Sequence, residues 1–140
     1  MTPNEIALLA LRPPIDTEPT AENSPESFQN QTLRPVLKLH NDLLVRLFQQ
    51  YLVKRKQGGP DGRFARITRP EQVAYIDHTI CTDQKFRNLL VGCVVGHFTA
   101  AELTAFLADE SELTRRLVNL IIDRLSDQLT AVLRAGPAVE

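Results

Sequence analysis

Histidine and cysteine are the side chains of this sequence best suited to bind a metal ion. His97 follows Cys93 by four residues, and Cys81 follows His78 by three. On a helix, both spacings place the two side chains on one face, as ligands of a shared ion require. A site of Cys93 and His97, completed by His40 from another helix, would be the centre of a small metal-dependent enzyme. We therefore single out His40, His78, Cys93 and His97 as the polar residues to locate in a structure.

No catalytic or metal-binding motif supports that site. The sequence contains no CxxC, HExxH, GxSxG, P-loop or GxGxxG. Asp77 precedes His78 and Asp42 follows His40 by two residues, but side chains at those spacings diverge on a helix. We therefore predict no catalytic residue, no metal ligand and no cofactor. The sequence leaves enzymatic activity open and favours a non-enzymatic role.

A basic cluster between residues 54 and 69 is the clearest charged feature. Asp61 is the only acidic residue in this segment. The six basic residues are Lys54, Arg55, Lys56, Arg63, Arg66 and Arg69. Such a loop, with Phe64 between its arginines, could hold nucleic-acid phosphates or an acidic partner. The formal net charge of −1 argues against general nucleic-acid binding. We therefore favour a protein partner, with nucleic-acid binding through loop 54–69 as an alternative.

The first 24 residues differ from the rest of the chain. They are rich in proline and acidic residues, which predicts a flexible tail over 1–24. One piece of it is apolar and is a candidate docking peptide, formed by Leu8, Leu9, Leu11 and Arg12. Such a piece is too short to be a stable helix by itself in water. It needs a groove, either on this chain or on a partner.

Apolar residues from residue 25 onward recur in steps of three and four, which predicts an all-α bundle over 25–135. We expect about five helices, two of them long, over 26–57 and 110–134. Pro35 either kinks the first long helix or marks its true start. The shorter helices begin at capping-box spacings, and a short C-terminal tail covers 136–140. No segment alternates as a strand would.

The last predicted helix has an unusually wide apolar face. Val118 and Ile122 extend its apolar stripe over more than half of the circumference. This predicts contact on two sides, either with a second subunit or as a central helix wrapped by the shorter ones. Gly92 and Gly96, four residues apart, predict a close helix crossing, because glycine is otherwise unfavourable inside a helix.

The sequence favours a cytoplasmic protein. Two cysteines are too few for the disulfide framework of a small secreted protein. No apolar run is long enough to span a membrane, and the N-terminus lacks the pattern of a signal peptide. We expect no membrane association.

Four stretches together resemble a group of short, uncharacterised bacterial proteins that often bear the label "glyoxalase". They are residues 8–13, 28–39, 83–90 and 96–99. The glyoxalase I fold holds His, Gln and Glu ligands on strands, which this sequence does not offer. The hydrolase class of glyoxalase needs a His-x-His-x-Asp-His motif, which is absent. We therefore judge the label unsupported and predict a non-enzymatic interaction or regulatory module that acts as a homo-oligomer.

Overall fold

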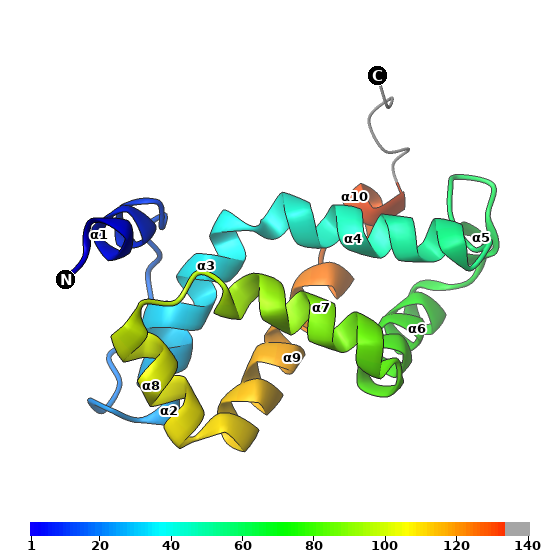
Figure 1. Ribbon diagram of the computed structural model, residues 1–140. Helices are drawn as coiled ribbons and strands as arrows, with labels where there is room; N and C mark the ends of the chain where they lie inside the picture. The colour runs from blue at the N-terminus through cyan, green and yellow to red at the C-terminus, as the bar shows by residue number, and fades with distance from the viewer. Residues whose placement is uncertain (134–140) are drawn as a thin grey trace.

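The computed structural model describes residues 1–133, and all regular structure within them is helical (Figure 1). The elements are α1 (Pro3–Ala10), α2 (Pro25–Phe28), the π-helical turn η1 (Gln29–Leu33), α3 (Arg34–Leu39), α4 (Asn41–Lys54), α5 (Arg63–Arg66), α6 (Arg69–Thr82), α7 (Gln84–Val95), α8 (Ala100–Ala108), α9 (Glu110–Ser126) and α10 (Leu129–Leu133). The all-α prediction is confirmed. Residue 134 and the predicted tail 136–140 lie outside the described residues. None of the helices described is both long and apolar enough to cross a membrane.

The prediction of about five helices is too low, because both long helices are divided and because α1 and α5 form within the predicted tail and loop. The segment 26–57, predicted as one helix, comprises α2, η1, α3 and α4, and it ends at Lys54. In η1 the Arg34 amide donates to the carbonyl of Gln29, which widens the turn just before Pro35. A proline ring crowds the preceding helical turn and has no amide hydrogen, so the wider turn accommodates it. Pro35 is accordingly the second residue of α3.

The true bend in this segment lies at His40. Its backbone has φ −101° and ψ 18°, outside helical values, and α4 leaves at an angle to α3 (Figure 1). The bend allows the apolar faces of both helices to share one core. The buried side chains are Leu33, Val36 and Leu37 before it, and Leu44, Val45, Phe48 and Leu52 after it.

Helix α9 is the central helix of the bundle. It packs against η1, α6, α7, α8 and α10. Val118 and Ile122, which widen its apolar face, are both buried within the chain. The wide stripe is therefore used inside the bundle, as the second of the two interpretations predicts. The expected single helix over 110–134 is wrong, since a turn at residues 127–128 separates α9 from α10.

The core contains an aromatic cluster centred on Phe48, which is fully buried. Its ring lies 5.9–6.4 Å from those of Tyr51, Phe64, Tyr75 and Phe86, measured between centroids. These rings come from α4, α5, α6 and α7. Phe48 thus joins its own helix to the three helices that follow it along the chain, and aromatic pairs at such distances stabilise beyond the area that they bury.

Local signals in the sequence are confirmed at several helix starts. Thr68 with Glu71 and Thr99 with Glu102 form complete capping boxes at α6 and α8.

The predicted close crossing over Gly92 is wrong, because a Cβ atom placed there would meet nothing within 4 Å. Gly92 is an exposed helix position that no neighbouring helix approaches.

Candidate functional site

His40 and His97 come together, although they are far apart in the sequence. His40 lies at the bend between α3 and α4, and His97 lies in the link between α7 and α8. The two Nε2 atoms form a hydrogen bond, and the ring centroids are 4.1 Å apart with the planes at 67°. Within residues 1–133, however, no group of three or more His, Cys, Asp or Glu side chains could hold a metal ion. Cys93 does not complete a three-ligand site with these histidines.

The surroundings of His97 favour its neutral form. Burial lowers the pKa of His97, and the nearby His40 and the Arg12 cation lower it further. The Nδ1 atom of His97 is buried and has no hydrogen-bond partner. Because one cation already lies beside the pair, a second cation would be repelled. The arrangement is that of a hydrogen-bonded histidine pair in which the surroundings disfavour a charge on His97.

Arg12 is held in a buried ion pair next to these histidines. Its side chain is 7% exposed, and Nη1 and Nη2 donate to the two carboxylate oxygens of Glu102 at 2.5 and 2.7 Å. Nη2 also donates to the carbonyl oxygen of His97 at 2.7 Å. The sequence pattern predicted Arg12 as part of a docking peptide. The structure places its guanidinium inside the chain, where it fixes the N-terminal segment to α8.

Glu102 has two structural roles that the sequence showed only in part. It closes the capping box of α8 by accepting from the Thr99 amide at 2.8 Å, and it also accepts from the Thr32 hydroxyl at 3.2 Å. Burial alone would raise the pKa of Glu102, but the hydrogen bonds from Arg12 and Thr99 outweigh it and lower that pKa. The capping motif was visible in the sequence, whereas the pairing with Arg12, ninety residues away, was not.

The apolar residues of the candidate docking peptide remain at the surface. Leu9 and Leu11 are exposed, Leu8 is half-buried, and no residue of α1 is buried. On α8, Leu103 and Leu107 are also exposed, one turn apart. The Ala100 amide donates to the Glu5 carboxylate at 3.4 Å, so the two helices are in direct contact. We call the exposed apolar side chains of α1 and α8, together with Leu11, the α1–α8 surface.

The basic cluster lies around α5 and is largely solvent-exposed. All six of its cations are exposed. Arg55 pairs with Asp83 at 2.9 Å and lies over the Tyr51 ring. Phe64 is only 1% exposed and belongs to the core, so it offers no ring on which a base could stack.

The other candidate pair, His78 and Cys81, is exposed on α6. The Cys81 thiol donates a hydrogen bond to the Asp77 carboxylate.

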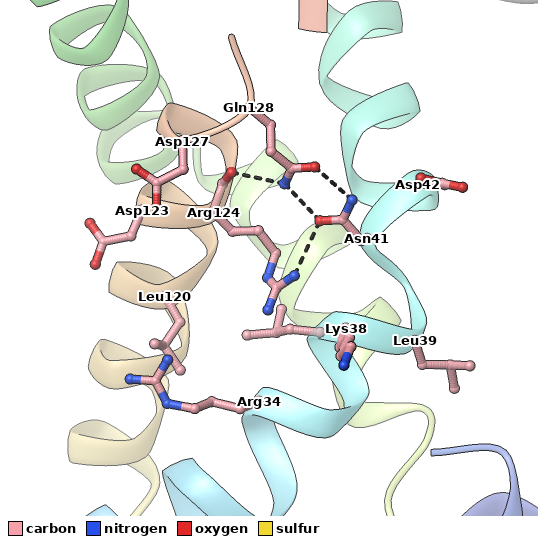
Figure 2. Close-up of a pocket in the computed structure, with 11 residues that line it drawn as sticks. Arg34, Lys38, Leu39, Asn41, Asp42, Leu120, Asp123, Arg124, Asp127 and Gln128 are labelled. Carbon is pink, nitrogen blue, oxygen red and sulfur yellow. Dashed lines mark hydrogen bonds between the residues drawn. The ribbon is translucent and has the colours of Figure 1, made fainter. Parts of the chain in front are cut away.

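A polar cleft of about 740 Å³ lies between the α3–α4 segment and the end of α9. Figure 2 shows its residues, which sequence reasoning did not single out. They are Arg34, Leu37, Lys38, Leu39, Asn41, Asp42, Leu120, Asp123, Arg124, Asp127 and Gln128. Asn41 and Gln128 join the walls by a pair of amide hydrogen bonds, each 2.7 Å long. The Arg124 guanidinium donates to the Asn41 side-chain oxygen at 3.2 Å.

Two arginines enter this cleft from opposite walls, Arg34 from α3 and Arg124 from α9 (Figure 2). Neither forms an ion pair with a carboxylate of the described residues. Burial lowers the pKa of Arg124, and the positive charge of Arg34 lowers it further. Two like charges therefore face one partly enclosed space.

Comparisons with known proteins give no match: no family model, no curated protein and no solved structure is significantly similar to the chain.

Proposed function

We propose that the protein is a non-enzymatic interaction module that self-associates, and that it does so through the α1–α8 surface. The observation that supports this is the exposure of apolar side chains on two helices that are fixed to each other. Ile6 and Leu11 are each 57% exposed, and Leu107 is 53% exposed. Single exposed apolar residues are common, but a set of them on adjoining elements is typical of a contact surface.

The state of α1 supports an occupant for this surface. A helix of eight residues is not stable by itself in water, and most helical stability in proteins comes from packing of an apolar face. No residue of α1 is buried, so this chain supplies little of that packing. A second copy that covers the apolar residues of α1 would supply it.

The Arg12–Glu102 pair explains how the surface is kept in shape. Removing two charges from water is unfavourable, and buried pairs are weak evidence for stability. Such a pair does fix geometry, because its bidentate hydrogen bonds tolerate little displacement. In this proposal its role is to hold α1 beside α8 with the apolar side chains facing outward.

Light scattering coupled to size-exclusion chromatography tests the proposal. We expect the full chain to be an oligomer, and Leu103→Gln with Leu107→Gln to shift it toward the monomer without changing its circular dichroism spectrum. Leu89→Gln is the matched control, because Leu89 on α7 is 49% exposed, between Leu103 at 38% and Leu107 at 53%. A wild-type chain that is strictly monomeric at high concentration would contradict the proposal.

Two other functions remain proposals with tests of their own. The meeting of His40 and His97 favours a metal-dependent enzyme, although the described residues provide no third ligand. Metal analysis of untagged protein decides it, since absence of bound metal and an unchanged melting temperature with added zinc or nickel would exclude it. Nucleic-acid binding through Arg55, Arg63, Arg66 and Arg69 requires salt-dependent binding of DNA or RNA at low ionic strength.

We further propose that the protein works in the cytoplasm. Cys81 and Cys93 are both free thiols, as a reducing compartment favours.

A further inference from the structure

We propose that the cleft between the α3–α4 segment and α9 binds a compact oxyanion of a small molecule, held between Arg34 and Arg124. This inference is independent of the self-association proposal, because it concerns a different surface. The ligand chemistry is that of a phosphate or carboxylate group.

Hydrogen bonds orient both guanidinium groups, but some of their N–H donors have no acceptor. The Arg34 Nε donates to the Asn30 side-chain oxygen at 3.0 Å, and the Arg124 Nη1 donates to Asn41 at 3.2 Å. The terminal nitrogens of Arg34 and the second terminal nitrogen of Arg124 have no partner among the described residues. Arginine presents a planar set of N–H donors that matches oxyanions, so these free groups form a suitable pair of binding arms.

Hydrogen bonds among side chains hold the side of the cleft that carries Arg124 in place. Gln128 donates both to Asn41 and to the backbone carbonyl of Arg124, and Asn41 donates back to Gln128. These bonds fix the position of Arg124 before any ligand arrives, which reduces the entropy lost on binding. Repulsion between Arg34 and Arg124 is relieved when an anion lies between them.

The carboxylates around the cleft limit the size of the ligand. Asp42, Asp123 and Asp127 also line the cleft, but in Figure 2 their carboxylates point away from the two arginines. A polyanion such as a nucleic acid would place further phosphates near these carboxylates, and like charges in contact are unfavourable. A compact anion avoids them. Lys38 adds a third cation at the edge, where it donates to the Pro14 carbonyl at 3.2 Å.

Isothermal titration calorimetry of the full chain tests the proposal, with inorganic phosphate, succinate and a single-stranded oligonucleotide as separate probes. Chloride at matched ionic strength is the background. We expect saturable binding of phosphate or succinate, and the better of the two identifies the group. Arg34→Gln should weaken that binding roughly tenfold to a hundredfold, as the loss of charge-assisted hydrogen bonds does. Arg46→Gln, an exposed arginine of α4 outside the cleft, should leave it unchanged.

The outcomes that overturn the proposal are equally specific. Absence of saturable binding by both small anions would refute it, as would equal binding by wild type and Arg34→Gln. Tighter binding of the oligonucleotide than of either small anion would refute the size limit. Arg34→Gln is preferred to a change at Arg124, whose bond to Asn41 joins two helices. Side-chain amide NMR signals of Asn41 and Gln128 provide a second measurement, since a ligand in the cleft must shift them.

Discussion

Replacing Arg12 by methionine should destabilise the chain far more than replacing an exposed arginine in an ion pair. The change keeps most of the side-chain volume but leaves the Glu102 carboxylate without its cation. Breaking a buried pair in this way costs about 3 to 5 kcal/mol. Since the Glu102 side chain is still 17% exposed, water relieves part of the penalty, and we expect about 3 kcal/mol. That is a large share of a typical total stability of about 5 to 15 kcal/mol.

Urea unfolding followed by circular dichroism measures this loss, and Arg115→Met is the matched control. Arg115 also pairs with a glutamate at 2.5 Å, but Arg115 is 59% exposed, and its partner Glu112 is 33% exposed and also pairs with Arg116. We expect the control to change the free energy of unfolding very little, because exposed pairs contribute little. Adding Glu102→Gln to Arg12→Met should restore part of the loss, since the neutral amide no longer needs a cation. Limited proteolysis should cut the N-terminal segment of Arg12→Met faster than that of the wild type.

The pH dependence gives the same prediction a second test. In the wild type the pKa of Glu102 is below its ordinary value of 4.5, so the stabilisation is present above pH 4.5 and is lost as pH falls through the folded-state pKa. In Arg12→Met the unpaired carboxyl should have a raised pKa and take up a proton on acidification. The difference between the two proteins should therefore narrow from neutral to acidic pH. An equal loss for Arg12→Met and Arg115→Met, at every pH, would refute the reasoning.

Three further predictions follow from the same structure. Gly92→Ala should raise the free energy of unfolding by about 1 kcal/mol, because the helix gains propensity and the new Cβ meets no neighbour; a loss in thermal unfolding would contradict this. The pKa of His97 is below its ordinary value of 6.5, so the folded state binds fewer protons and stability should fall as pH drops below 6.5. His97→Gln should flatten that slope between pH 7.5 and 5.5 in urea titrations, and an unchanged slope would show that other groups cause it. Phe48→Ala should cost about 3 to 5 kcal/mol, since it removes the centre of the aromatic cluster; a loss below 1 kcal/mol would show that the core closes over the gap.

Local signals were reliable where they depended on neighbouring residues. The capping boxes at Thr68 and Thr99 marked helix starts correctly, because their hydrogen bonds span only three residues. The breaks at His40 and at residues 127–128 were missed. Both lie within continuous apolar periodicity, and the chain bends there to direct two faces to one core, which is a tertiary requirement.

For the candidate sites, the sequence indicated which residue types could take part but not which residues they contact in the fold. His40, Cys93 and His97 were named together as residues to locate; the two histidines meet, and Cys93 completes no three-ligand group with them among the described residues. Arg34 and Arg124 were not noticed at all, because each is an ordinary polar residue of its own helix. They line one cleft only because the fold places the α3–α4 segment opposite the end of α9.

By itself, the sequence determined the helical class and the helix starts that capping boxes mark, because spacing and capping act over a few residues. The tertiary structure alone decided that Arg12 lies inside the chain with Glu102, that the wide face of α9 is satisfied internally, and that two arginines share a cleft. Each of these depends on which distant segments meet. Loops and bends determine which segments come into contact, and no short-range pattern in the sequence specifies these contacts.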